Sequence, residues 1–129
     1  MSFTTPNEYC RYKLVLRMLK TIQFHEGYSC LEIGCGNGLF ISKISSLGLK
    51  VAGIDISEKS VAIAKKNNPD STILKRSLFD VDDKYDIIFC FEVLEHLEND
   101  DKAIEKMSQS LKKGGSLIFS VPAHPVLYR

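Results

Sequence analysis

The chain has 129 residues, of which 44% are hydrophobic and 26% charged, and its formal net charge at pH 7 is +1. This length and composition predict a single globular domain over residues 1–129. The small net charge argues against a broad phosphate-facing surface and against nucleic acid as a partner, although a small nucleic-acid substrate stays open. The sequence has no apolar run of membrane-spanning length and no signal-peptide core, so no membrane partner is expected.

The cysteine pattern indicates a reduced, cytoplasmic protein. The four cysteines contain no C-x-x-C pair, and two of them fall within or at the end of expected buried strands: Cys10, Cys30, Cys35 and Cys90. Neither a disulfide framework nor a zinc site is therefore expected.

Helix and strand patterns alternate along the chain. The first helix is expected over residues 7–24, where apolar residues recur every three or four positions after Pro6. The expected strands are residues 28–33, 49–54, 71–75, 85–91 and 116–121, and the expected helices between them are 39–47, 58–67 and 100–111. Gly48 should end one helix, Ser57 should cap the next, and Gly114-Gly115 should end the last. This alternation predicts an α/β fold with parallel strands, right-handed crossovers and helices on both faces.

One glycine-rich stretch organises the rest of the chain. Residues 31–38 read Leu-Glu-Ile-Gly-Cys-Gly-Asn-Gly, at the end of the first expected strand. Glycines at alternate positions permit a tight turn and a close approach of the backbone to a ligand. A dinucleotide-binding loop would read G-x-G-x-x-G, but position 39 is Leu. The acidic Glu32 beneath the turn suits a ligand with a positive group, although a purely structural turn between strand and helix remains the alternative.

A second acid lies at the end of the next expected strand. Asp55 follows the first glycine of the loop by about twenty residues, where a carboxylate can accept hydrogen bonds from both ribose hydroxyls. An Asp at this position is also a common signal for a helix start, and that interpretation stays open. Because the carboxyl ends of parallel strands meet at one edge of the sheet, Glu32 and Asp55 are expected to share a site.

These motifs together resemble class I S-adenosylmethionine-dependent methyltransferases, of the type 11/12-like group, and the likeness covers nearly the whole chain. It rests on the glycine loop, Asp55, the run Asp86-Ile87-Ile88-Phe89-Cys90-Phe91-Glu92-Val93-Leu94-Glu95-His96-Leu97, and Val121-Pro122-Ala123-His124-Pro125. The resemblance implies a Rossmann-like three-layer α/β/α sandwich, with a mostly parallel sheet of strand order 3-2-1-4-5 in a core over residues 28–121. It implies S-adenosylmethionine as cofactor and S-adenosylhomocysteine as product.

The resemblance also implies a role for each matching residue. The loop residues Glu32, Gly34, Cys35, Gly36, Asn37 and Gly38 would bind the cofactor, Asp55 its ribose, and Ile56, Ser77 and Leu78 its adenine. Phe91 and Glu92 would face its methionine part, over which Tyr9 and Arg11 of the first helix would close. Glu95 and His96 are the catalytic candidates, as a general base if the methyl acceptor must lose a proton.

A metal site is an alternative for part of this set. Glu92, Glu95 and His96 would share one helical face, because they are spaced i, i+3 and i+4. Some methyltransferases use this pattern for a divalent cation, but no downstream residues that would complete such a site are evident here. No metal is therefore expected.

Members of the family normally continue beyond the fifth strand with a helix and an antiparallel hairpin. This chain ends at Arg129, so the sheet is expected to lack strands 6 and 7, as in a truncated protein. The exposed edge of the fifth strand could then pair with a second copy and form a homodimer.

The expected function is transfer of a methyl group from S-adenosylmethionine to an unidentified small-molecule or other acceptor. A catalytically incomplete cofactor-binding or partner-binding module is the main alternative. A nicotinamide-dependent oxidoreductase is disfavoured by the glycine spacing and by Glu32.

Overall fold

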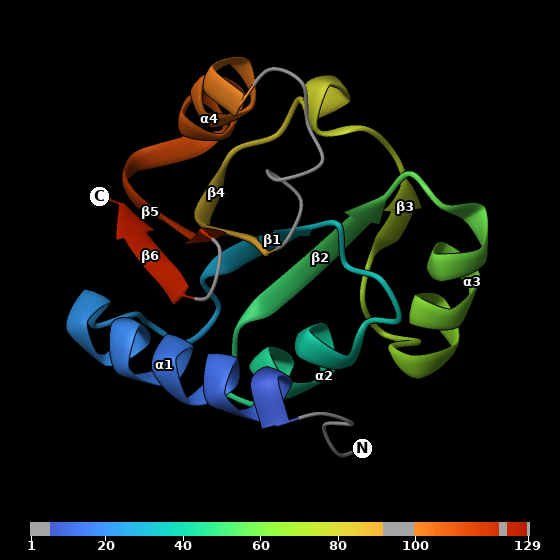
Figure 1. Cartoon of the computed structure of the whole chain (residues 1–129), viewed down its shortest axis with the longest axis horizontal. Coiled ribbons are helices and arrows are strands. Elements are labelled where there is room, and N and C mark those ends of the chain that lie inside the picture. The colour runs from blue at the N-terminus through green and yellow to red at the C-terminus, as the bar shows by residue number, and fades with distance from the viewer. Residues whose placement is uncertain (1–5, 92–99, 122–123, 129) are drawn as a thin grey trace.

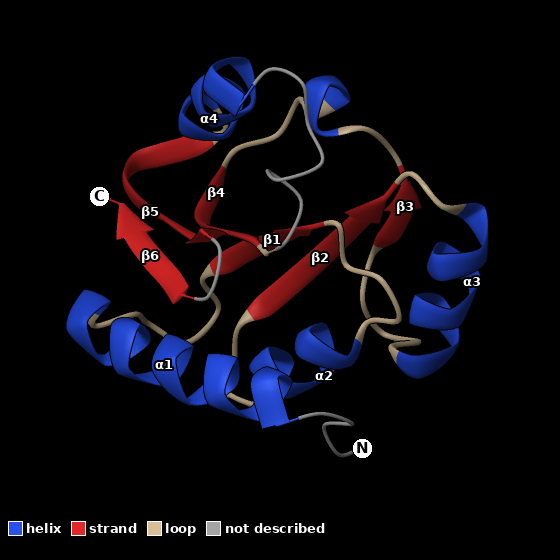
Figure 2. Cartoon of the chain, in the orientation of Figure 1, coloured by secondary structure: helices blue, strands red, loops and turns tan. Residues whose placement is uncertain are grey.

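The protein is built on one six-stranded sheet with helices on both faces (Figures 1 and 2). The computed structural model describes residues 6–91, 100–121 and 124–128. Along the sheet the strands follow the order β3-β2-β1-β4-β5-β6. The order of the first five strands confirms the expected Rossmann-like arrangement. Its switch point, where the strand order reverses, lies between β1 and β4.

The first five strands are parallel to one another. They are β1 (Ser29–Ile33), β2 (Lys50–Asp55), β3 (Ile73–Lys75), β4 (Tyr85–Cys90) and β5 (Leu111–Val121). Asp86 strengthens the centre of the sheet, since its Oδ2 accepts hydrogen bonds from the Ser29 backbone N–H at 2.8 Å and the Ser29 hydroxyl at 3.1 Å. Because β1 pairs with β2 on one side and with β4 on the other, the carboxyl ends of these three strands lie side by side.

The structure adds a sixth strand to the five that were expected. β6 (His124–Tyr128) runs antiparallel to β5, with Leu117 opposite Tyr128 and Val121 opposite His124. The expectation that the edge of β5 is exposed is therefore wrong, because β6 covers it. Pairing of two copies through this end of the sheet stays a prediction, and the strand available for it is β6.

In the described part of the chain, three helices cover one face of the sheet, and the other helical elements cover the opposite face (Figure 1). The first layer consists of α1 (Pro6–Ile22), α2 (Leu39–Ser45) and α3 (Glu58–Asn67). The second consists of α4 (Asp100–Gln109) and the short 3-10 helix η1 (Leu78–Asp80). The start of α3 agrees with its sequence signal, since Ser57 Oγ accepts from the Ser60 N–H at 3.2 Å. Helix α2 ends earlier than expected, at Ser45 with Ser46 as its C-cap, and Gly48 lies in the turn beyond it with φ of 88°.

The boundary between α4 and β5 differs from the prediction. Helix α4 ends at Gln109, and Leu111 already pairs with Tyr85 of β4. Gly114 and Gly115 therefore do not end a helix; they lie in β5, where the pairing with β4 shifts between Tyr85 and Ile87. Gly114 has φ of 78°, and a Cβ on Gly115 would lie 2.9 Å from the Lys112 carbonyl oxygen. Glycine at these two positions thus permits a backbone irregularity that residues with a side chain could adopt only with strain.

Two apolar cores lie on opposite faces of the sheet. Ile87 and Phe89 of β4 pack toward α1 and α2, with Val15, Leu19 and Ile44. Ile88 and Cys90 point the other way and pack with Ala103 and Met107 of α4. This alternation along one strand is why β4 reads as a continuous apolar run. No helix in the described part of the chain is long and apolar enough to cross a membrane.

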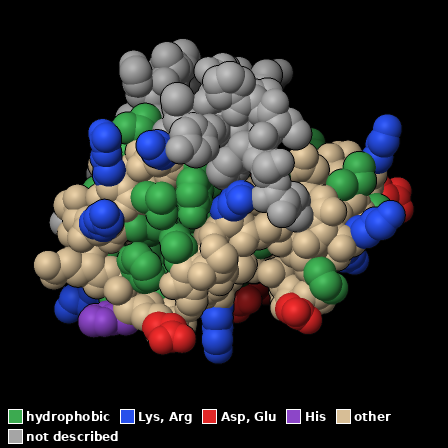
Figure 3. All heavy atoms as spheres, turned by 90° about the horizontal axis from the view of Figure 1, so that it is seen from below, with side chains coloured by type: hydrophobic (Ala, Val, Ile, Leu, Met, Phe, Trp, Pro, Cys, Tyr) green, Lys and Arg blue, Asp and Glu red, His purple; other side chains and the backbone are tan. Residues whose placement is uncertain are grey.

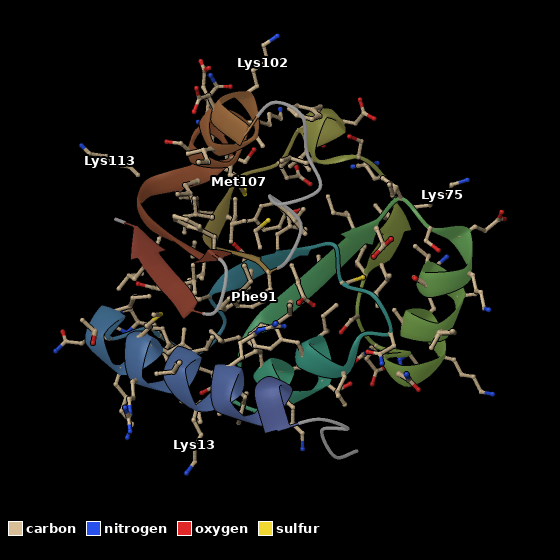
Figure 4. All side chains as sticks on the ribbon, viewed as in Figure 1. Lys13, Lys75, Phe91, Lys102, Met107 and Lys113 are labelled. Atoms are coloured by element: carbon tan, nitrogen blue, oxygen red, sulfur yellow. The ribbon has the colours of Figure 1, made fainter. Side chains whose placement is uncertain are left out.

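The surface on the side of α1 and α2 is mixed in character. Figure 3 shows apolar side chains gathered toward the middle of this face, with Lys and Arg side chains around them. On α1 itself, Lys13, Arg17 and Lys20 are exposed as the helical periodicity predicts, and Figure 4 shows Lys13 pointing away from the sheet.

Met107→Ala should destabilise the fold strongly. Met107 is fully buried between α4 and the sheet (Figure 4), so the substitution removes apolar contacts and leaves a cavity. We expect a loss of about 2–5 kcal/mol in the free energy of unfolding, measured by urea denaturation. The control is Ser108→Ala, an exposed neighbour on the same helix, which should change that value by less than about 0.5 kcal/mol. Equal effects of the two substitutions would contradict this core packing.

Candidate functional site

The glycine-rich loop between β1 and α2 is tied to the end of β2 by backbone hydrogen bonds. The N–H groups of Gly34 and Cys35 both donate to the carbonyl oxygen of Ile54, at 2.8 and 3.0 Å. The loop closes on itself through the Gly38 N–H, which donates to the Cys35 carbonyl at 3.0 Å. The loop is therefore held across two adjacent strand ends, at the point where ligands bind in doubly wound sheets.

Asp55 connects this loop to the start of α3. Its Oδ2 accepts a hydrogen bond from the Gly36 N–H, and its Oδ1 accepts one from the Ser57 N–H, both at 2.9 Å. Each oxygen keeps a further lone pair, because an ionised carboxylate offers about four acceptor sites. The carboxylate is thus fixed in orientation and can still accept hydrogen bonds from a ligand.

Gly36 and Gly38 have left-handed backbones but different surroundings. At Gly36, with φ of 54°, no described atom outside the glycine and its two chain neighbours lies within 4 Å of the place where a Cβ would be. At Gly38, with φ of 79°, a Cβ would lie 2.5 Å from Asn68 Nδ2 and 3.0 Å from the Ala64 Cβ. Gly36 therefore faces open space, whereas Gly38 faces packed protein.

Glu32 is an acid buried at the end of β1. It is 5% exposed, and its Oε1 has no hydrogen-bond partner among the described residues. Burial raises the pKa of Glu32 well above its usual value; the Arg11 guanidinium opposes this shift and the Asp55 carboxylate adds to it. Glu32 and Asp55 lie on the same face of neighbouring strands, since Glu32 pairs with Gly53 and side chains alternate along β2. The site is thus an acidic pair beside one arginine.

Aromatic side chains form the wall of the site nearest to α1 and α2. The Arg11 guanidinium lies 5.2 Å from the centroid of the Phe91 ring, within the range of a cation–π contact. Phe40 of α2 packs edge-on against Phe91 and Phe89, with centroid distances of 5.0 and 5.1 Å. Figure 4 shows Phe91 between the sheet and the helices below it. Arg11 and Phe91, far apart in sequence, are thus brought to the same place as Glu32.

The residues expected around adenine surround the ends of β2 and β3. Ile56 follows Asp55 and is 76% exposed, so its apolar side chain is accessible to a ligand. Leu78 is buried in the second core, and the Ser77 hydroxyl accepts a hydrogen bond from the Phe79 N–H at 3.2 Å. Phe79, which the sequence analysis did not select, is 48% exposed close to these residues in the chain.

Several expected site residues lie outside the described part of the structure. These are Glu92, Glu95 and His96, together with the side chain of Tyr9, whose backbone belongs to α1. Among the residues that are described, no three His, Cys, Asp or Glu side chains gather as metal ligands.

The thiols near the site are protonated at neutral pH. Burial raises the pKa of Cys35 to about 12, and the nearby Glu32 and Asp55 carboxylates add to the shift. Burial also raises the pKa of Cys90 to about 12. Because the thiolate is the nucleophilic form, neither side chain is suited to covalent catalysis.

Sequence reasoning missed the residues that hold the far side of the loop. Asn68, just after α3, donates from Nδ2 to the Gly38 carbonyl oxygen at 2.9 Å, and Asn67 Nδ2 donates to the Asn37 carbonyl oxygen at 2.9 Å. The only local signal was an Asn before Pro69 at a helix end, which predicts where the helix stops but not what the side chain contacts.

A separate pocket of about 480 Å³ lies at the opposite end of the sheet. It is lined by residues at the amino ends of β1 and β2, including Ser29, Lys50 and Val51, and by the segment 70–72 before β3. None of the expected site residues lines it, so it is distinct from the site at the carboxyl ends.

Comparison with known protein families matches residues 4–129 to the family described as a methyltransferase domain. The chain belongs to this methyltransferase domain family. Curated relatives include two ubiquinone biosynthesis O-methyltransferases. The protein from Hydrogenovibrio crunogenus is 30% identical over 115 residues, which cover 83% of this chain and 48% of the relative. The protein from Chelativorans sp. is 36% identical over 97 residues, which cover 70% and 38%. The chain thus spans about half the length, or less, of these relatives.

Solved structures share the fold. Magnesium protoporphyrin IX methyltransferase from Synechocystis PCC 6803, with bound SAM, superposes with a TM-score of 0.78 at 24% identity, over 88% of this chain and 58% of that one. A plantazolicin methyltransferase in complex with a pentazolic desmethylPZN analog and SAH superposes with a TM-score of 0.75 at 22% identity, over 90% of this chain and 48% of that one. The Rossmann-like methyltransferase fold is therefore established for this chain.

Replacing Glu32 should change how stability depends on pH. Because the folded protein holds the Glu32 proton more tightly than the unfolded chain does, the free energy of unfolding should fall as pH rises above the usual Glu value of 4.5. Glu32→Gln removes this fall, so the ligand-free variant should be more stable than wild type toward neutral pH, with the difference shrinking toward pH 4.5. Urea denaturation at a series of pH values measures it.

The matched control is Glu105→Gln, since Glu105 is exposed on α4. Its stability should follow the wild-type curve throughout. Parallel curves for wild type and Glu32→Gln would contradict the buried, proton-holding state of Glu32.

Proposed function

We propose that this domain binds S-adenosylmethionine at the carboxyl ends of β1, β2 and β4 and serves in methyl transfer. One observation carries the proposal: the acids Glu32 and Asp55 lie on the same face of adjacent strands, joined by a glycine-rich loop whose Gly36 faces open space. Membership of the methyltransferase domain family supports it, as do structural relatives crystallised with SAM or SAH.

The residues at the site fit the charged end of this cofactor. The Glu32 Oε1 is buried without a hydrogen-bond partner, and a ligand ammonium group would supply both the missing donor and the missing positive charge. Arg11 beside Phe91 offers a cation for the ligand carboxylate. A dinucleotide pyrophosphate, by contrast, would meet two carboxylates at this place.

The adenosine end is matched by residues of the next strands. Asp55 already accepts one backbone hydrogen bond on each oxygen, which orients its remaining lone pairs for two ribose hydroxyls. The exposed Ile56 would cover one face of the adenine, and Ser77 and the Leu78 backbone would meet its polar edge. The aromatic wall of Phe91 would pack along the methionine part.

S-adenosylmethionine supplies a methyl group on a sulfonium, which an O, N or C nucleophile displaces in line. The contribution of this chain would be to fix that methyl group relative to the acceptor and to exclude water, because positioning alone can supply much of the rate. Glu95 or His96 would take the proton from an acceptor that must lose one. Oxygen acceptors are the first to test, since the curated relatives are named as O-methyltransferases.

We also propose that the protein works in a reducing compartment, the cytoplasm. The cysteines Cys30, Cys35 and Cys90 are free and buried, as they would be in a protein that relies on no disulfide.

Asp55→Ala and Gly36→Val should each abolish binding of S-adenosylhomocysteine, measured by isothermal titration calorimetry. Asp55→Ala removes the acceptor of the ribose hydroxyls and releases the Gly36 N–H. Gly36→Val fills the open space above the loop and strains a left-handed backbone. Asp101→Ala, an exposed acid on α4, is the control and should bind as wild type.

Circular dichroism must show that each variant is folded at the temperature of titration. Wild-type affinity in both Asp55→Ala and Gly36→Val would reject the assigned site. Binding by wild type without methyl transfer to any acceptor would favour a cofactor-binding module, and binding of NADH in place of S-adenosylhomocysteine would favour an oxidoreductase.

A further inference from the structure

We propose that Asn68 is a positioning residue that holds the glycine-rich loop in its ligand-binding shape; the inference rests on the proposed function of that loop. Asn68 follows α3 and is only 7% exposed. No role follows for it from the sequence motifs. Figure 1 shows the carboxyl end of α3 beside the loop that connects β1 to α2.

The Asn68 amide joins three segments of the chain. Its Nδ2 donates to the Gly38 carbonyl oxygen at 2.9 Å and to the Ala64 carbonyl oxygen at 3.1 Å. Its Oδ1 accepts a hydrogen bond from the Ser42 hydroxyl of α2. Because both partners of Nδ2 are carbonyl oxygens, which only accept, the orientation of the amide is determined by its contacts.

The absence of a side chain at Gly38 makes this contact possible. A Cβ there would lie 2.5 Å from Asn68 Nδ2, so the amide occupies the volume that any other residue would need. Asn68 thus holds the last residue of the loop from the protein side, while Asp55 holds Gly36 from the side of the strands. The neighbouring Asn67 adds a hydrogen bond to the Asn37 carbonyl oxygen.

These contacts set the direction of the loop peptides. With the carbonyl groups of Asn37 and Gly38 turned toward α3, the open side of the loop at Gly36 is free of their oxygens. Both carbonyl groups that the Asn68 amide contacts also accept backbone hydrogen bonds, the Gly38 carbonyl from the Ser42 N–H at 3.1 Å and the Ala64 carbonyl from the Asn68 N–H at 2.9 Å. Loss of the Asn68 side-chain donor would therefore remove the hydrogen bond that joins the loop to the end of α3 and allow the loop to relax into other arrangements. A ligand would then have to order the loop when it binds, which lowers affinity.

Asn68→Asp is the sharpest test, because the side chain keeps its shape while a carboxylate cannot donate to two carbonyl oxygens. We expect affinity for S-adenosylhomocysteine to fall about tenfold or more by calorimetry, at a temperature where the variant is folded. Ser42→Ala removes the donor to Oδ1 together with the contact of the same hydroxyl with the Gly38 carbonyl oxygen at 3.2 Å, but it leaves the Asn68 donor in place and should cause a smaller loss of about threefold. If Asn68→Asp does not fold, the affinity of Ser42→Ala tests the proposal: a loss of about threefold supports it, and wild-type affinity overturns it.

The matched control is Ser110→Ala. Ser110 is also buried, and its hydroxyl donates to the Lys106 carbonyl at 2.8 Å, but it follows α4 at the opposite end of the sheet. This variant should lose stability and bind S-adenosylhomocysteine within about twofold of wild type. An equal loss of affinity in Ser110→Ala and Asn68→Asp would overturn the positioning role, because general destabilisation would then explain both.

Hydrogen exchange of the ligand-free protein tests the positioning role directly. Amides of residues 38–42 should exchange faster in Asn68→Asp than in wild type or Ser110→Ala. Unchanged exchange together with wild-type affinity overturns this inference and leaves the proposed function standing. Failure of wild type itself to bind S-adenosylhomocysteine overturns the proposed function, so the two failures are distinguishable.

Discussion

The geometry of the site depends on the Asp55 carboxylate and its two backbone donors. One oxygen holds the Gly36 N–H of the loop and the other holds the Ser57 N–H at the start of α3. A single side chain therefore fixes the turn that follows β1 and the helix that follows β2. Charge-assisted hydrogen bonds of this kind are stronger than neutral ones, so the loop is ordered before any ligand arrives. Pre-ordering of this kind lowers the entropy that binding must overcome.

The same arrangement has a cost for the ligand-free protein. Glu32 is buried close to Asp55, and its Oε1 has no partner among the described residues. The protein tolerates this acid by raising its pKa and by placing Arg11 nearby, which reduces the repulsion without removing it. A cationic ligand group would relieve both the unpaired oxygen and the repulsion. Under the proposed function, the stability lost by burying this acid would be recovered when a cationic ligand binds, an exchange that is common at binding sites.

Most of the architecture follows from local sequence patterns. Buried parallel strands are continuous apolar runs, and a signal such as Ser57 marks the start of a helix by its own chemistry. The predictions fail where contacts between residues far apart in the sequence determine the local structure. Leu111 continues the apolar spacing of α4, yet its backbone pairs with Tyr85, and β6 forms because β5 offers it a partner. Within the site, the two acids could be predicted from their places at strand ends, whereas Asn68 could not, because its partners lie in a loop and a helix thirty and twenty-six residues away.

The glycines of the loop explain why its spacing carries functional information. A side chain at Gly36 would project into open space, whereas a side chain at Gly38 would need the volume that Asn68 and Ala64 occupy. One glycine therefore belongs to the proposed binding surface and the other to the packing of the loop against α3. A loop with only the first would reach the ligand but have no anchor on α3, and a loop with only the second would be anchored but closed. Both requirements are met within one short turn, because glycine adopts the left-handed backbone that Gly36 and Gly38 both have.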